Sequence, residues 1–424
     1  MIKLLTKRTP LSVPEAIQKV MNYKKKGNIE YISIHHSFQR FLAEDVIATH
    51  DVPHFDRSPY DGFAVRSIDT VEANLDLPVE FEVIDSIGAG SVTKKTVGPF
   101  QAVRIMTGAK LPEECDAVVM LELAQTYTKN ENNYMSIKRS YKKGDNVSFR
   151  GEDIKKGEVI VRKGTYINPG IQAILATFGY HQVPVARKPI IGIYATGSEL
   201  LDVEDSLQPG KIRNSNSYML LAQIERAGGE ARYFGKLPDD VDICFESISK
   251  AINEVDFFIT TGGVSVGDYD YMPDIYQRLE AEVLFNKVAM RPGSVTTVAQ
   301  TKESVLFGLS GNPSACYVGF ELFVRPLIRT MLFSSQPHLQ KECAILGSDF
   351  PKPNPFTRFV RSKVSIMNGK LYANPSGKDK SNMVTSLVGA NAFMILPGGT
   401  RGYKEGDEVD VLILDNQEGC EWSW

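Results

Sequence analysis

The pattern of apolar and polar positions changes several times along the chain. Between residues 186 and 331, apolar runs of strand length alternate with segments of helical periodicity, for example PIIGIYATG, SYMLLAQIERAGG and DFFITTGG. This alternation is typical of a mostly parallel sheet with helices on both faces. Three strand-like runs follow each other near the end of the region, so we expect a mixed edge. The pattern therefore predicts a three-layer α/β/α domain.

The N-terminal segment has helical periodicity. Residues 12–24 carry one apolar face, and Ser12 with Glu15 three positions later forms a capping-box pattern. We predict a second helix over about 36–45, with Phe38, Leu42 and Ala43 facing inward, and a third over 168–180.

Two other regions alternate with the period of strands. Short apolar runs separated by Gly, Pro and Asn occur between 78 and 147 and again between 334 and 424, which is typical of small β domains. We therefore expect an α/β multidomain chain with four parts. Their predicted bounds are 1–50 with 148–185 for a discontinuous helical N-terminal domain, 51–147 for an inserted β domain, 186–331 for the α/β domain, and 334–424 for a C-terminal β-barrel-like domain.

Composition narrows the class of protein. The 424 residues are 42% hydrophobic and 23% charged with a net charge of −3, so no general basic field attracts nucleic acid. No run of about 20 apolar residues predicts a membrane span, and residues 1–16 lack the apolar core of a signal peptide. Five scattered cysteines without CxxC spacing fit a reducing compartment. We expect a cytoplasmic protein that binds neither nucleic acid nor membrane.

The stretch from Asp256 to Asp270 has the pattern of a ligand-binding loop. An apolar run breaks into a loop of small residues in which Gly262, Gly263, Ser265 and Gly267 stand close together. A buried strand that ends in such a loop gathers backbone N–H groups where a phosphate can bind. For the glycines alone, an ordinary tight connection is an equally good interpretation.

Charged and capping residues follow other strands of the same predicted sheet. Glu199, Asp239 and Asp270 are carboxylates at predicted strand ends and could hold a divalent cation. Asn312 and Pro313 open a helix whose N-terminus favours an anion, and Lys287 and Arg291 supply positive charge. In open α/β sheets these loops meet at the carboxyl edge. Together they indicate phosphate chemistry.

Three further features leave two readings open. The loop at 51–65, which contains Asp61, is dense in Pro, Gly and Asp, and it is either a functional loop or a plain turn. Thr107 at a strand end could bind an oxyanion or make a turn. Arg358 and Arg361 alternate with apolar residues on one strand and either face an anionic ligand or lie on a solvated face.

Motifs along nearly the whole chain resemble those of the molybdopterin molybdenumtransferase family, bacterial enzymes similar to the E domain of gephyrin. The motifs are RFLAEDV (40–46), DVPHFDRSPYDGFAV (51–65), RIMTGAKLP (104–112), RGEDI (150–154), ATGSEL (195–200), TTGGVSVGDYDY (260–271), KVAMRPG (287–293) and GLSGNPSA (308–315). The chain departs from the family at residues 57–60, at Ser310 where Pro is usual, and at Arg291 where Lys is usual.

The resemblance implies a reaction and an assembly. Enzymes of this family take adenylylated molybdopterin and molybdate, cleave the adenylate with release of AMP, and leave molybdenum on the dithiolene, with a divalent cation such as Mg²⁺. It further implies an elongated four-domain homodimer whose site lies between the α/β domain of one subunit and the inserted β domain of the other. The adenylylating enzyme is a separate protein partner.

The motifs and the resemblance together suggest roles for individual residues. Carboxylates hold the cation or orient the attacking oxygen; these are Asp61, Glu199, Asp239 and Asp270, with Asp153 a weaker member. Phosphate or oxyanion is bound by Thr107, Gly262, Gly263, Ser265 and Gly267. Lys287 and Arg291 neutralise developing charge, and Asn312 and Pro313 shape the anion pocket. The resemblance adds Arg361 and Ser381 as ligand contacts from the C-terminal domain. Asp56 and Asp268 are expected to stabilise loops.

Other functions fit parts of the sequence. One alternative is a scaffold or binding module of the same fold, but such a protein has no need of clustered acids. Another is a tungsten-inserting relative, which the sequence cannot distinguish because it has the same motifs. A nucleotide-dependent dehydrogenase is disfavoured, because the first predicted strand of the α/β domain is not followed by GxGxxG.

Overall fold

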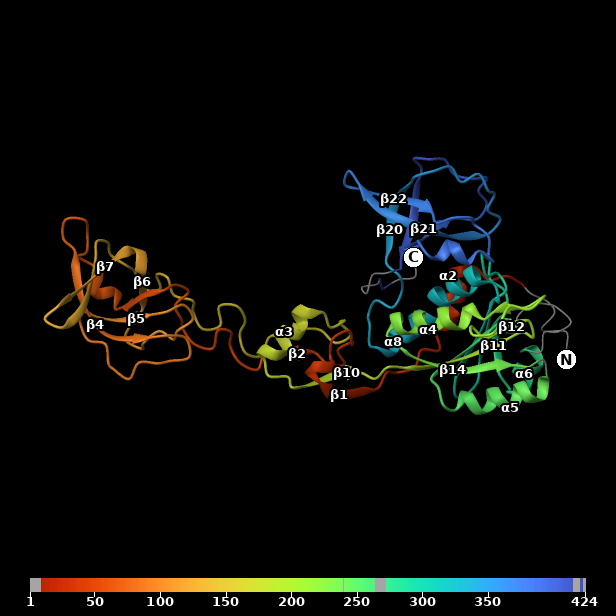
Figure 1. Ribbon diagram of the computed structural model, residues 1–424, viewed down its shortest axis with the longest axis horizontal. Helices are drawn as coiled ribbons and strands as arrows, with labels where there is room; N and C mark the ends of the chain where they lie inside the picture. The colour runs from red at the N-terminus through yellow and green to blue at the C-terminus, as the bar shows by residue number, and fades with distance from the viewer. Residues whose placement is uncertain (1–8, 239, 264–271, 415–419, 422–424) are drawn as a thin grey trace. The chain divides into compact units, whose positions relative to one another are not determined.

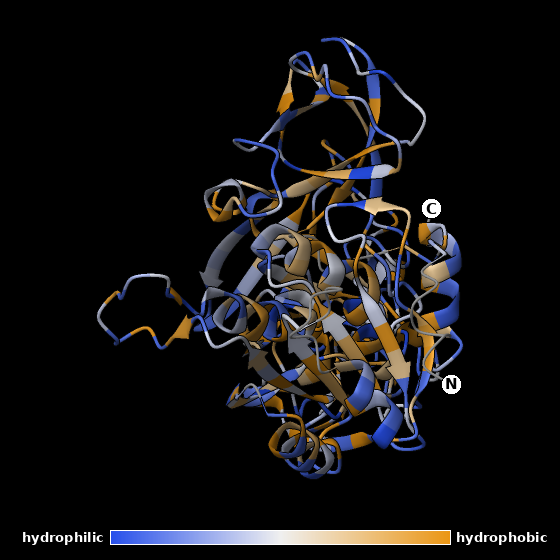
Figure 2. Ribbon diagram, turned by 90° about the vertical axis from the view of Figure 1, so that its right-hand side faces the viewer, coloured by the Kyte–Doolittle hydropathy of each residue, from blue (hydrophilic) through white to orange (hydrophobic). Residues whose placement is uncertain are grey.

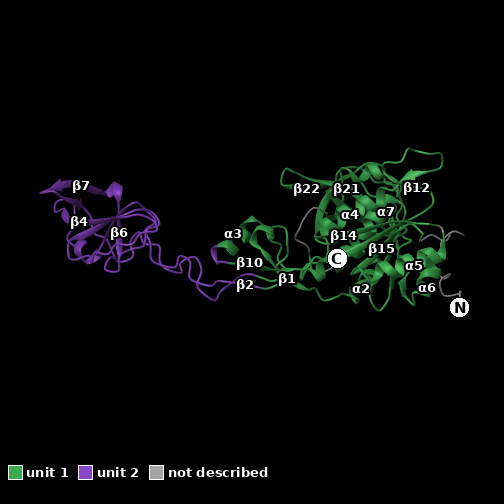
Figure 3. Ribbon diagram, turned by 60° about the horizontal axis from the view of Figure 1, so that its bottom comes forward, with its two compact units in different colours: residues 1–44, 162–176, 180–424 green, residues 45–161, 177–179 purple. Residues whose placement is uncertain are grey.

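The computed structural model describes residues 9–238, 240–263, 272–414 and 420–421. The chain divides into two compact units (Figure 3). Unit 1 comprises residues 1–44, 162–176 and 180–424, and unit 2 comprises residues 45–161 and 177–179. Five residues with predicted roles lie outside the described residues: Asp239, Ser265, Gly267, Asp268 and Asp270.

A six-stranded sheet forms the centre of unit 1 (Figure 1). Its order is β14 (Glu230–Leu237), β11 (Ile190–Thr196), β15 (Phe257–Thr261), β19 (Val305–Leu309), β18 (Thr297–Gln300) and β16 (Glu282–Phe285). The first four strands are parallel, and β18 and β16 each run antiparallel to their neighbours. The predicted parallel sheet with one mixed edge is confirmed.

Helices cover both faces of this sheet. On one face, the core includes α2 (Val13–Met21), α4 (Ser215–Ala227), α7 (Pro313–Gly319) and α8 (Arg325–Met331). On the other face, α5 (Val241–Ile252) packs with α6 (Met272–Arg278). Neighbouring residues of β15 point to opposite cores, since Phe257 joins the first and Phe258 the second. Every residue of β15 and β19 is buried, as expected of central parallel strands. In Figure 2, orange apolar segments occur on strands and helices and alternate with blue polar segments.

The first helix forms where the sequence predicts it. The Glu15 N–H donates to Ser12 Oγ at 3.4 Å, and the Ser12 N–H donates to Glu15 Oε2 at 2.9 Å, which completes the capping box. Val13, Ala16 and Ile17 are buried in the core of the α/β sheet. No helix of the described residues is long and apolar enough to cross a bilayer.

The helix predicted over about 36–45 is wrong. A short 3₁₀ turn (Ile34–His36) is followed by Gln39 with φ +64°, a left-handed conformation that ends any helix. Phe41 and Leu42 instead form β-bridges with Tyr166 and Val185. Nearby, β1 (Ile29–Ser33) pairs antiparallel with β10 (Gln182–Ala186), and the third predicted helix is present as α3 (Pro169–Thr177).

The C-terminal part of unit 1 is a closed five-stranded barrel, as predicted. Its strands are β20 (Lys341–Leu346), β21 (Thr357–Met367), β22 (Lys370–Pro375), β23 (Ala392–Leu396) and β24 (Glu408–Ile413). The long strand β21 closes the barrel by pairing with both β22 and β23. A short strand, β17 (Met290–Arg291), leaves the α/β domain and pairs in parallel with the start of β21.

Unit 2 is built mainly of strands. Its sheet has the order β6 (Ala117–Met120), β3 (Gly62–Val65), β5 (Gln101–Ile105), β4 (Val79–Ile87), β8 (Asn132–Ile137) and β7 (Ala124–Lys129). A separate two-stranded sheet pairs β2 (Val46–Ile47) with β9 (Val159–Val161). Five strands of the larger sheet lie in the region whose alternating pattern predicts strands. The sixth, β3, lies in the stretch 51–65, which the sequence predicts to be a loop, so that prediction is wrong at its C-terminal end.

Candidate functional site

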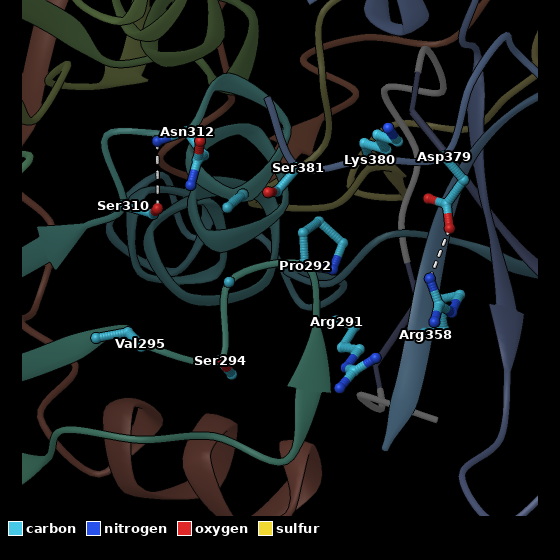
Figure 4. A pocket seen from close by; sticks show the side chains of 12 residues that line it. Arg291, Pro292, Ser294, Val295, Ser310, Asn312, Arg358, Asp379, Lys380 and Ser381 are labelled. Atoms are coloured by element: carbon cyan, nitrogen blue, oxygen red, sulfur yellow. Dashed lines mark hydrogen bonds and ion pairs between the residues drawn. The ribbon is translucent and has the colours of Figure 1, made fainter. Parts of the chain in front are cut away.

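A pocket of about 300 Å³ lies in unit 1 between the α/β domain and the barrel (Figure 4). Four segments form it: the turn after β17, the loop that leads into α7 with the start of that helix, the start of β21, and the loop after β22. The residues that line it are Arg291, Pro292, Gly293, Ser294, Val295, Ser310, Asn312, Ala315, Arg358, Asp379, Lys380 and Ser381.

The turn after β17 forms one wall. Arg291 ends β17 and lies opposite Arg358 in the parallel pairing with β21. Gly293 has φ +86°, and a Cβ atom there would lie 2.9 Å from Met290 Cε and 3.3 Å from the Ala315 carbonyl oxygen. Glycine is therefore required where the turn meets α7.

The start of α7 forms a second wall and is tied to the loop after β22. The Asn312 N–H donates to Ser310 Oγ at 3.2 Å, and Pro313 occupies the first turn of the helix. The Ser314 N–H donates to the Ser381 carbonyl oxygen at 3.0 Å. The structure thus brings together three predicted residues that are far apart in sequence, Arg291, Asn312 and Ser381.

Arg361 lies behind this pocket. Its side chain is 1% exposed and donates to Asp379 Oδ1 at 2.9 Å, to the Lys380 carbonyl oxygen at 3.2 Å and to Ser386 Oγ at 3.3 Å. Burial lowers the pKa of Arg361, and the adjacent Asp379 carboxylate opposes that effect. The solvated-face reading of Arg361 is therefore wrong. Arg361 also does not line the pocket, so its predicted ligand contact stays a prediction.

The loops that follow β11, β15 and β19 meet at the carboxyl edge of the sheet. The Gly262 N–H donates to the Leu309 carbonyl oxygen at 3.0 Å. Gly262 and Gly263 have φ +87° and +65°, and a Cβ atom on Gly262 would lie 2.7 Å from the Thr196 carbonyl oxygen. Backbones approach closely here, as a phosphate-binding edge requires.

Glu199 stands exposed in the turn after β11, at the same edge of the sheet. An exposed carboxylate here suits a hard cation such as Mg²⁺. No group of three or more His, Cys, Asp or Glu side chains suited to a metal occurs among the described residues, and Asp239 and Asp270 lie outside them. The metal-ligand set Glu199, Asp239 and Asp270 stays a prediction. Lys287 accepts a backbone hydrogen bond from Leu11 and does not line the pocket described above.

Unit 2 brings Asp61 and Thr107 together. Both the N–H and the hydroxyl of Thr107 donate to Asp61 Oδ1, at 2.8 and 2.7 Å. These two hydrogen bonds hold the pKa of Asp61 below its usual range, and Arg104 adds a smaller effect in the same direction. Asp56 accepts a hydrogen bond from the Arg150 N–H at 2.7 Å, which confirms its expected role in stabilising a loop.

Sequence reasoning missed two charged residues of the pocket wall, Asp379 and Lys380, and left the role of Arg358 open. Asp379 and Lys380 precede the predicted Ser381 in the stretch GKDKS (377–381), where charges of both signs are concentrated in a turn. These charged residues beside the predicted ligand residue Ser381 are the feature of the sequence that could have indicated them.

Three family models match the chain in order. They are the MoeA N-terminal region (domains I and II) over residues 11–179, a probable molybdopterin binding domain over 192–330, and the MoeA C-terminal region (domain IV) over 343–414. The molybdopterin molybdenumtransferase of Bacillus subtilis is 59% identical over 421 residues, covering 99% of this chain and 98% of that protein. The chain belongs to the molybdopterin molybdenumtransferase family.

Other members of the family support the assignment. The molybdopterin molybdenumtransferase of Staphylococcus epidermidis is 49% identical over 97% of both chains. The crystal structure of the molybdopterin biosynthesis MoeA protein from Pyrococcus horikoshii is 31% identical, covers 96% of this chain and 100% of its own, and superposes with a TM-score of 0.84. This member of the molybdopterin molybdenumtransferase family is therefore an enzyme of molybdenum cofactor biosynthesis.

Proposed function

We propose that the enzyme inserts molybdenum from molybdate into adenylylated molybdopterin, with cleavage of the adenylate and release of AMP. The observation that carries this proposal is the pocket between the α/β domain and the barrel, which has cationic and hydroxyl groups in its wall. Such a pocket is suited to a tetrahedral oxyanion. The family assignment supports molybdopterin as the other substrate.

The cationic residues, the glycine-rich loop and the start of α7 have different proposed roles. Arg291 and Lys287 neutralise negative charge that develops when the phosphoanhydride bond breaks. Gly263, Ser265 and Gly267 bind phosphate oxygens through backbone N–H groups. Gly262, whose own N–H is bonded to the Leu309 carbonyl oxygen, holds the loop at the sheet edge where the phosphate binds. Asn312 and Pro313 shape the oxyanion pocket, and Ser381 and Arg361 support it from the barrel side.

The carboxylates have a separate role. Asp61 is held ionised by Thr107 and orients the attacking oxygen, which belongs to water or to molybdate. Glu199, Asp239 and Asp270 would hold a divalent cation such as Mg²⁺, which supplies charge neutralisation on the pyrophosphate. Exposure of Glu199 at the carboxyl edge fits this role.

The enzyme is further proposed to act as a homodimer that receives its substrate from a separate adenylyltransferase. The family resemblance, rather than any observed interface, supports this assembly. A mixing experiment tests it: Asp61→Ala and Arg291→Ala proteins, each inactive alone, are denatured together, refolded and assayed for AMP release. Recovered activity supports sites built from two copies, and failure to recover any activity contradicts that arrangement.

AMP release by the purified protein tests the reaction itself. Incubation with adenylylated molybdopterin, Mg²⁺ and molybdate should release AMP, and omission of molybdate should slow the release. Tungstate in place of molybdate tests the alternative of a tungsten-inserting enzyme. A protein that binds the substrate but releases no AMP under any of these conditions would be a binding module.

A further inference from the structure

Arg358 stands in the wall of the pocket with a tightly fixed guanidinium group (Figure 4). Its Nε donates to Asn354 Oδ1 at 2.6 Å and its Nη1 donates to Asp379 Oδ2 at 2.7 Å. The guanidinium carbon lies 5.8 Å from the centre of the Phe350 ring. The side chain is only 11% exposed. Arg358 is therefore held at the pocket surface.

The base of this arrangement is itself rigid. Asn354 is 1% exposed, and its Nδ2 donates to Thr400 Oγ1 at 3.0 Å. Its backbone forms a β-bridge with Thr400 as well. Because the amide of Asn354 is fixed by these contacts, its oxygen presents one defined position to Arg358. A supporting shell of this kind is what precise ligand contacts require.

Asp379 connects Arg358 to the interior of the barrel. One carboxylate oxygen accepts from Arg358, and the other accepts from the buried Arg361 at 2.9 Å. The other side-chain hydrogen bonds of Arg361 are to Lys380 and Ser386. Arg361 therefore holds Asp379 from the interior of the barrel. The contacts form a series from the core, through Asp379, to the guanidinium of Arg358.

The charges that line the pocket do not balance. Arg291, Arg358 and Lys380 are positive and Asp379 is negative, which leaves a net charge of +2. Arg291 and Arg358 lie opposite each other on paired strands, and no ion pair of Arg291 occurs within the described parts of the chain. Two such cations repel each other unless an anion lies near both. A dianion such as molybdate matches this net charge.

We propose that Arg358 is a ligand of the molybdate oxyanion and that Asp379 is the positioning residue that directs Arg358 into the pocket. The inference rests on the proposed function and deepens it. Arg361, whose side chain is 1% exposed and does not line the pocket, acts through Asp379 and does not touch the ligand.

Binding of sodium molybdate to the full-length protein, measured by calorimetry, tests the role of Arg358. Arg358→Gln removes the charge but leaves Asp379 paired with Arg361, so the fold is retained. The dissociation constant for molybdate should rise by about tenfold or more, the usual effect of losing a charge-assisted hydrogen bond.

Lys352→Gln is the matched control. Lys352 Nζ lies 3.7 Å from Asp379 Oδ2, so it has the same acidic partner, but it does not line the pocket. This variant should bind molybdate within about twofold of the wild type, since its exposed ion pair is worth little. The inference is overturned if Arg358→Gln binds like the wild type, if Lys352→Gln loses as much affinity, or if the wild type does not bind molybdate.

Asp379→Asn tests the positioning role. The substitution makes the pocket more positive, so charge alone would tighten binding, whereas loss of the aligned Arg358 weakens it. We expect a higher KM for molybdate in AMP release with kcat retained at saturating molybdate. A fall in kcat with unchanged KM would indicate a merely structural role and contradict the assignment.

The two proposals can fail separately. If the wild type binds molybdate but releases no AMP, the proposed reaction is wrong, and molybdate binding alone decides the role of Arg358. If the wild type releases AMP and Arg358→Gln has an unchanged KM for molybdate, the reaction stands and the inference about Arg358 is wrong.

Discussion

Thr107 donates two hydrogen bonds to a single carboxylate oxygen of Asp61, one from its backbone at 2.8 Å and one from its hydroxyl at 2.7 Å. Hydrogen bonds to the ionised form stabilise it, so the pKa of Asp61 is lowered. Any stabilisation from this pair is present above the ordinary pKa of aspartate. It is lost as the pH falls through the lowered pKa.

Thr107→Val should raise the pKa of Asp61 toward its ordinary value, because the hydroxyl donor is lost while the backbone donor remains. The carboxyl carbon of Asp61 would be followed by NMR during an acid titration. Thr93→Val is the control, since Thr93 donates to Asp85 at 2.6 Å in the same unit. An Asp61 titration that is the same in wild type and Thr107→Val would contradict the account.

Gly262→Ala should disrupt the carboxyl edge of the sheet. The residue has φ +87°, and the added Cβ would lie 2.7 Å from the Thr196 carbonyl oxygen. The left-handed conformation alone costs about 1 kcal/mol, and the contact adds to it. AMP release should be largely lost. Gly210→Ala controls for the conformational cost, because Gly210 has φ +76° with open space around it. Equal activity losses in both variants would show that the close approach to Thr196 is unimportant.

Asp379→Ala should destabilise the barrel by about 3 kcal/mol, because it leaves the buried Arg361 without its carboxylate. Hydrogen exchange of the β21 amides measures the loss within the barrel itself. Asp410→Ala breaks the exposed pair with Lys341 and should change stability by no more than about 1 kcal/mol. If Asp379→Ala also changed the stability by no more than about 1 kcal/mol, the buried Arg361 would not need the Asp379 carboxylate, and the account would be contradicted.

Removal of divalent cations with EDTA should abolish AMP release, and added Mg²⁺ should restore it. Glu199→Gln should raise the Mg²⁺ concentration needed for half-maximal activity, because a neutral amide is a poorer ligand for a hard cation. Glu204→Gln, at an exposed position in the following loop, should leave that concentration unchanged. Full activity in EDTA would exclude the role proposed for Glu199.

The sequence predicts the elements whose signals are local. Ser12 and Glu15 are three residues apart, so the capping box that begins α2 can be read directly. The parallel sheet follows from alternating strand and helix patterns, and its order places Gly262 beside Thr196 and close to Gly311. Asn312 and Ser381, predicted from motifs, line one pocket with Arg291.

The predictions from sequence that are wrong concern residues whose conformation is set by contacts between distant segments. Phe38 and Leu42 have helical spacing, yet the β-bridges of Phe41 with Tyr166 and of Leu42 with Val185 determine the local conformation. Arg361 resembles a solvated residue on an alternating strand until the barrel closes and brings Asp379 to it. Pairing across a closed barrel cannot be read from a local pattern, so the partner of Arg358 was missed as well.

AMP release from adenylylated molybdopterin in the presence of Mg²⁺, with and without molybdate, tests the central claim most directly. The wild type should release AMP with stimulation by molybdate, and Asp61→Ala should lose that release while it still folds. Substrate binding by the wild type without any release of AMP would contradict the transferase mechanism and the roles given to its residues.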